Sequence, residues 1–122
     1  MKRVILALGA AAATIGGTAV QADQTGLAGM HAQRVVKGRL CFTDHAHVGT
    51  GTRQPSKRAA ISAAAQDWSS FTAFEYGSSW AHWGVAIAKA TKCEPAGGKW
   101  TCEVQARPCL NRRTRRTRHV NR

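Results

Sequence analysis

The most regular pattern of apolar positions lies in the middle of the chain, over residues 55–76. Apolar side chains recur there at intervals of three and four residues, which is the period of a helix with one buried face. Five alanines between positions 59 and 65 favour a helix, Pro55 suits its first turn, with Gln54 or Ser56 at the cap, and Gly77 suits its end. We predict an Ala-rich helix over 55–76 whose core-facing stripe comprises Ile61, Ala64, Ala65, Trp68, Phe71 and Glu75.

Residues 99–107 alternate between apolar and polar side chains, as in a strand with one buried face. The preceding segment fits two periods, because Trp80, Trp83 and Ile87 have helical spacing while positions 83, 85, 87 and 91 have strand spacing. Gly84 disfavours a long helix. We therefore expect a turn through Trp80, a strand over 83–93 and an antiparallel hairpin closed by residues 94–98. The predicted class is α+β, a small unit with one helix followed by a hairpin.

The segment before the helix has no sustained period. We expect residues 23–39 to be poorly ordered, residues 40–42 to form a short strand or an anchor, and residues 44–53, rich in Gly, Thr and His, to form a loop. The chain then divides into a leader (1–22), an N-terminal arm with a His/Gly loop (23–52), a helix-plus-hairpin core (53–110) and a flexible tail (111–122).

The first 22 residues have the pattern of a secretory signal peptide. Lys2 and Arg3 precede an uncharged apolar run over residues 4–13, and Val20 and Ala22 are small residues of the kind a signal peptidase reads. Cleavage after Ala22 is favoured over cleavage after Ala19. The rest of the chain has no apolar run long enough to span a membrane. We expect a protein of the periplasm or the extracellular space.

Four cysteines in a small exported chain indicate two disulfides. Cys93 and Cys102 flank the predicted turn, which favours their pairing and leaves Cys41 with Cys109. The alternative, Cys93 with Cys109 and Cys41 with Cys102, is nearly as plausible. The spacings match no common zinc motif.

Composition adds a strong positive charge, with 18 basic and 6 acidic residues. Its excess is concentrated after position 106, where no acidic residue occurs. Guanidinium groups bind phosphate and carboxylate, so we expect the tail to attach to an anionic envelope polymer or lipid surface. Sequence-specific reading of nucleic acid is not expected. The candidate anion-binding residues are Arg107, Arg112, Arg113, Arg115, Arg116, Arg118 and Arg122.

Histidines supply the second candidate chemistry. His45 and His47 lie two positions apart, with Asp44 before them and His31 upstream. If extended, the two imidazoles point to the same side, where they can share a transition metal, copper or nickel above all. A third ligand is needed, and Asp44 or His82 is the candidate. No resident cofactor is expected.

Catalytic patterns are weak. The sequence has neither a nucleophile elbow nor a phosphate-binding glycine loop. The acid–base candidates Asp67, Glu75 and His82 form no clear pair, and Glu75 is expected to pair with Lys89 or an arginine, or to bind an indole N–H. We predict a protein that is not an enzyme. The four tryptophans, at 68, 80, 83 and 100, are expected to fill the core rather than to form a stacking surface.

The stretch 47–109 also carries a set of aromatic, glycine and cysteine positions: Gly49-x-Gly51, Trp68, Glu75-Tyr76-Gly77, Trp80-x-x-Trp83, Ala90, Cys93, Trp100-x-Cys102 and Ala106-x-Pro108-Cys109. It resembles small exported proteins of soil alphaproteobacteria, a group without an established activity. The resemblance implies export and a disulfide-bonded α+β unit and assigns no catalytic residue. The leading hypothesis is a protein attached by its tail, and the alternatives are metal binding through His45 and His47 and a cationic antimicrobial-like protein.

Overall fold

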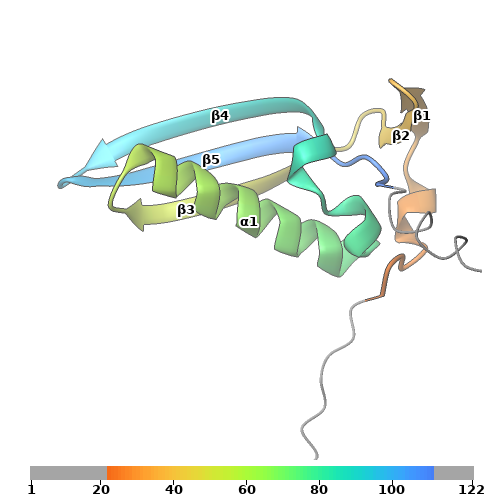
Figure 1. Ribbon diagram of the computed structural model, residues 1–122, viewed down its shortest axis with the longest axis horizontal. Helices are drawn as coiled ribbons and strands as arrows, with labels where there is room; N and C mark the ends of the chain where they lie inside the picture. The colour runs from red at the N-terminus through yellow and green to blue at the C-terminus, as the bar shows by residue number, and fades with distance from the viewer. Residues whose placement is uncertain (1–21, 112–122) are drawn as a thin grey trace, which may run out of the picture.

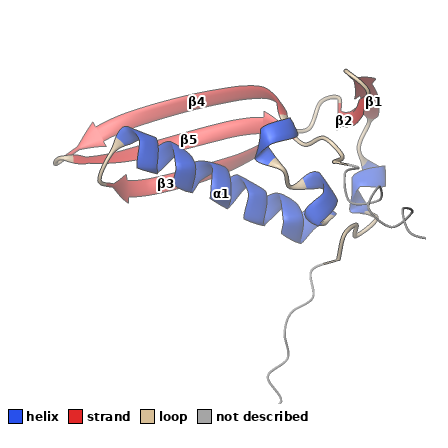
Figure 2. Cartoon of the chain, viewed as in Figure 1, coloured by secondary structure: helices blue, strands red, loops and turns tan. Residues whose placement is uncertain are grey.

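A computed structural model describes residues 22–111 and confirms the α+β class (Figure 1). One helix packs along one face of a three-stranded sheet, and a two-stranded hairpin lies at the end of the molecule where the helix ends (Figure 2). The strand order in the larger sheet is β3-β5-β4, with β5 antiparallel to both neighbours. The elements are η1 (Leu27–Met30), β1 (Gln33–Val36), β2 (Arg39–Phe42), β3 (His47–Gln54), α1 (Lys57–Tyr76), η2 (Ser78–Trp80), η3 (Trp83–Val85), β4 (Ile87–Ala96) and β5 (Lys99–Arg107).

The helix α1 begins and ends close to the predicted residues. Ser56 caps it by accepting a hydrogen bond from the backbone N–H of Ala59 (3.0 Å), and Gly77 follows it with φ +101°, a conformation that favours glycine. Its buried face follows every fourth residue rather than the predicted stripe, so Phe71 lies outside the core with 49% of its surface exposed. The buried face comprises Ala60, Ala64, Trp68, Thr72 and Tyr76.

Two glycines of β3 determine how closely the helix approaches the sheet. A Cβ atom on Gly49 or Gly51 would lie less than 3.0 Å from backbone atoms of α1, a contact that real side chains do not make. With no side chain at these positions, the alanines of α1 lie directly on the strand. The expectation of a loop over residues 44–53 is therefore wrong for the part that forms β3, because the glycines serve close packing and not a turn.

The expectation of a poorly ordered segment over residues 23–39 is also wrong. Strands β1 and β2 pair antiparallel across the Lys37-Gly38 turn, where both residues have positive φ. The end of β2 is joined to the C-terminal segment, because Phe42 N–H donates to Pro108 O (3.0 Å) and Leu110 N–H donates to Leu40 O (2.8 Å). These long-range bonds order a segment that has no strong period of its own.

The larger sheet departs from the predicted two-stranded hairpin in two ways, because β3 pairs with β5 as a third strand and because the start of β4 differs. Strand β4 begins at Ile87 rather than at position 83, because residues 83–85 form a 3-10 turn. This turn brings the Trp83 ring edge-on to the Trp68 ring, with ring centroids 5.3 Å apart. On β5, Cys102, Val104 and Ala106 are buried, as their alternation predicts.

The preferred disulfide pairing is confirmed. Cys41 is bonded to Cys109 and Cys93 to Cys102, and the described residues contain no free cysteine. Within residues 22–111, no helix is long and apolar enough to cross a membrane. The predicted leader up to position 21 and the tail from position 112 lie outside the described residues.

Candidate metal centre

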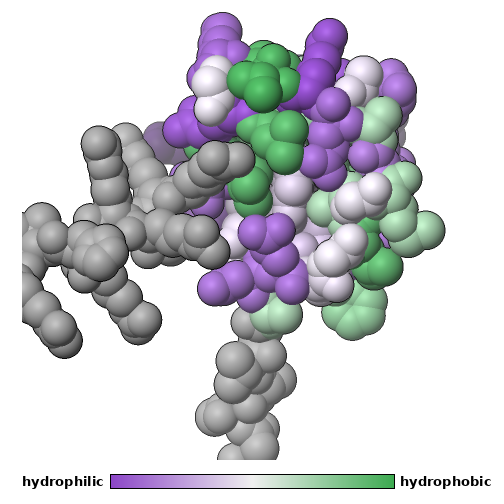
Figure 3. Space-filling view, turned by 90° about the vertical axis from the view of Figure 1, so that its right-hand side faces the viewer, coloured by the Kyte–Doolittle hydropathy of each residue, from purple (hydrophilic) through white to green (hydrophobic). Residues whose placement is uncertain are grey.

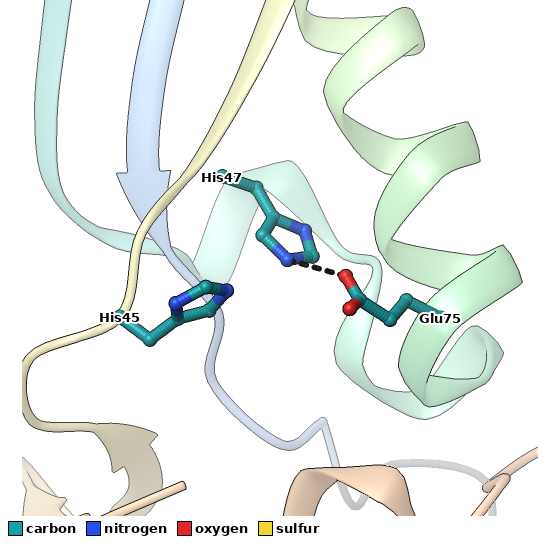
Figure 4. A group of neighbouring side chains, drawn as sticks. All are labelled: His45, His47 and Glu75. Atoms are coloured by element: carbon teal, nitrogen blue, oxygen red, sulfur yellow. Dashed lines mark ion pairs between the residues drawn. The ribbon is translucent and has the colours of Figure 1, made fainter.

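Three potential metal ligands meet beside the last turn of α1 (Figure 4). His45 lies just before β3, His47 is the first residue of β3, and Glu75 belongs to α1. One ligand atom from each lies within 4.8 Å of the others. His47 is buried, whereas His45 and Glu75 are partly exposed, so the group opens to solvent on one side.

Hydrogen bonds fix the tautomer of His47. The Thr72 hydroxyl donates to the backbone carbonyl of Trp68 (2.7 Å), and the same oxygen lies 2.9 Å from His47 Nδ1. A hydroxyl has a single proton to donate, so it accepts from His47 and Nδ1 carries the hydrogen. In the neutral ring, Nε2 is then bare and presents a lone pair.

The lone pair of His47 faces a carboxylate. Its Nε2 lies 2.9 Å from Glu75 Oε2 and has no hydrogen-bond partner among the described residues. Burial lowers the pKa of His47 below its usual value, an effect that the charge of Glu75 opposes and that His45 and His31 reinforce. A neutral imidazole and a carboxylate present two acceptors to each other, and the contact becomes favourable when a proton or a metal cation lies between the two atoms.

Aromatic rings hold both imidazoles in place. The ring of His31 is stacked on that of His45, with centroids 4.2 Å apart, and the ring of Tyr76 is stacked on that of His47, with centroids 5.0 Å apart. The Tyr76 hydroxyl lies 2.8 Å from His31 Nε2. The ligand set is therefore preorganised by packing, which lowers the ordering cost of binding.

Tyr76 offers a test of this packing, because it is the only tyrosine in the chain. Burial, and then the charge of Glu75, raises the pKa of Tyr76 from its usual 10.0 to about 12. Between these values the unfolded chain ionises and the folded protein does not, so unfolding releases a proton and stability falls as the pH rises from 10 to 12. We expect near-ultraviolet absorbance after a rapid pH jump to show tyrosinate forming at about pH 12 in the folded protein.

The guanidinium-unfolded chain is the control, and its tyrosine is expected to titrate near its usual value of 10.0. A folded protein that ionises at the same pH as the unfolded chain would show that Tyr76 is not packed as described.

The structure assigns different surroundings to the other predicted residues. Neither Asp44 nor His82 joins the three-residue group. Among residues 22–111, Glu75 forms its ion pair with His47 and not with Lys89 or an arginine. Asp67 accepts a hydrogen bond from the backbone N–H of Thr50 (2.8 Å), which joins α1 to β3. The prediction of a core role holds for Trp68 and Trp80, which are buried.

Of the seven arginines predicted to bind anions, only Arg107 lies within the described residues. Arg107 directs its guanidinium to the backbone carbonyls of Phe42 and Thr43, so at least part of its role is to bind the end of β2. The other six arginines, from Arg112 to Arg122, lie outside the described residues. Their attachment to an anionic surface stays a prediction.

Comparison with known proteins gives no assignment: no protein-family model, no curated protein and no solved structure matches the chain.

Proposed function

We propose that this protein binds a divalent transition metal ion outside the cytoplasm through His45, His47 and Glu75. The observation that carries the proposal is the 2.9 Å approach of His47 Nε2 to Glu75 Oε2, two atoms that both offer lone pairs once Thr72 holds the proton on Nδ1. A series of hydrogen bonds links the His47 ring to the Thr72 hydroxyl and the hydroxyl to the Trp68 carbonyl. Hydrogen bonds of this kind orient metal-bound histidines.

The types of ligand favour particular ions. Sites with nitrogen and oxygen ligands in square-planar or tetragonal arrangement are typical of Cu(II) and Ni(II), and this group offers two imidazole nitrogens and a carboxylate oxygen. The exposed side of Glu75 leaves room for water at the remaining positions. Zn(II) is the weaker candidate.

The signal-peptide pattern and the cysteines support the proposed compartment. A chain with a signal-peptide pattern and two disulfides suits an oxidising space outside the cytoplasm. We propose that the protein captures metal there without catalysing a reaction. Its three ligands with open positions suit reversible binding better than permanent burial of the ion.

The test is calorimetric titration of the untagged, oxidised protein with Cu(II), Ni(II) and Zn(II). We expect one ion per chain, with Cu(II) and Ni(II) bound more tightly than Zn(II), and loss of that site in the double variant His45→Ala/His47→Ala. The control is His82→Ala, which removes an exposed histidine of the described chain that does not belong to the group. Binding that survives in the first variant, or that is lost equally in the control, would overturn the proposal.

A further inference from the structure

A second candidate binding surface, made of exposed cations rather than metal ligands, lies on the β1–β2 hairpin. Arg34, Lys37 and Arg39 are all exposed on this hairpin, and no acidic residue occurs between Asp23 and Asp44. Within residues 22–111 none of these three cations forms an ion pair. The hairpin therefore presents uncompensated positive charge.

Exposed apolar side chains accompany these cations. Val35 is 70% exposed on β1, and the adjoining η1 exposes Met30 (80%) and Leu27 (45%). The side-chain amide of Gln33 donates to the carbonyl of Ala28 (2.6 Å), which ties η1 to the base of β1. Figure 3 looks at this end of the molecule, where hydrophobic side chains stand among hydrophilic ones near the top of the view.

The arginine tail starts at the base of the same hairpin. Leu110 N–H is bonded to the carbonyl of Leu40, Asn111 N–H to that of Ser79, and Cys109 to Cys41 of β2. The next residue is Arg112, the first of six arginines in the last eleven positions. The described chain therefore ends beside the hairpin, and the sequence that follows it is rich in arginine.

We propose that the β1–β2 hairpin docks on an anionic phospholipid bilayer. Cations near such a surface are attracted by its negative potential, and apolar side chains between them enter the interface. Nucleic acid fits less well, because the exposed hydrophobic residues of 27–36 are aliphatic and offer no ring for base stacking. Docking by this end leaves the β4–β5 turn, at the opposite tip in Figure 1, directed away from the bilayer.

The test is sedimentation of the oxidised protein without its predicted leader, residues 23–122, with vesicles of phosphatidylcholine containing phosphatidylglycerol. The variant Arg34→Gln/Lys37→Gln/Arg39→Gln is expected to bind about 100-fold more weakly, at roughly fivefold per cation. The matched control, Arg58→Gln/Lys92→Gln/Lys99→Gln, loses the same charge from exposed positions of α1, β4 and β5 and is expected to bind nearly as the unchanged protein does.

Two further arms make the outcome decisive. Val35→Ser is expected to cause a smaller, several-fold loss that persists at high salt, because it removes apolar contact and no charge. Equal losses in the two triple variants would show a net-charge effect and overturn the proposal. So would full binding by the hairpin variant with loss on deleting residues 112–122, or tighter binding to duplex DNA than to the vesicles at equal salt.

Discussion

Replacing Thr72 by Val is expected to weaken Cu(II) binding by about 10- to 100-fold, although Thr72 is not a ligand. Valine has a similar shape but cannot accept the Nδ1 proton of His47. The proton then moves to Nε2, where it donates to Glu75 across the existing 2.9 Å contact. The metal must displace that proton, so its affinity falls. Calorimetric titration gives the affinity, and ¹⁵N chemical shifts of the His47 ring report the tautomer in the metal-free protein.

Thr72→Ser is the matched control, because serine keeps the hydroxyl and should retain both the affinity and the tautomer. The valine variant also leaves the buried Nδ1 of His47 without a hydrogen-bond partner, which lowers the free energy of unfolding by about 1–3 kcal/mol. Denaturation separates that loss from the metal effect. An unchanged Cu(II) affinity in a folded Thr72→Val protein would show that the hydroxyl does not orient the ligand.

Local patterns were sufficient for much of the fold. The helix over Lys57–Tyr76 and the alternation along β5 have regular periods, and each is decided by neighbours a few residues away. The segment 23–53 depends on partners distant in the sequence, such as Pro108 for Phe42 and α1 for Gly49. Glycines that normally signal a loop mark a close helix contact here, and a single sequence does not distinguish the two.

Of the three ligands and the supporting Thr72, only the two histidines could be predicted as site residues from the sequence. The His-x-His spacing singles out His45 and His47, but Glu75 lies 28 positions from His47 on another element and has no local signal that pairs them. Thr72 was missed for a different reason, since a threonine on the buried face of a helix usually satisfies only its own backbone. Here it does so and also accepts from His47. The useful signal was its position three residues before Glu75, one turn earlier on the helix.

Removing the Cys41–Cys109 disulfide is expected to lower the free energy of unfolding by about 4 kcal/mol, and removing Cys93–Cys102 by about 2.5 kcal/mol, in the chain-entropy account. The difference arises because the first bond links residues 68 positions apart and the second links residues 9 apart. The variants are Cys41→Ala/Cys109→Ala and Cys93→Ala/Cys102→Ala, compared by guanidinium denaturation. Alanine is preferred to serine because three of the four positions are fully buried.

The first bond should also affect the metal centre, because its loss frees the segment that leads from Cys41 through Phe42 to His45. Phe42 packs against Tyr76 and Trp80 in a small core cluster that also contains Leu110. Release of this cluster removes the ring contacts that hold His31 on His45, so Cu(II) affinity should fall in Cys41→Ala/Cys109→Ala. It should stay unchanged in Cys93→Ala/Cys102→Ala, whose bond joins β4 to β5 and touches none of the ligands. Equal stability losses, or a metal affinity that falls only in the second variant, would contradict this division of roles between the two disulfides.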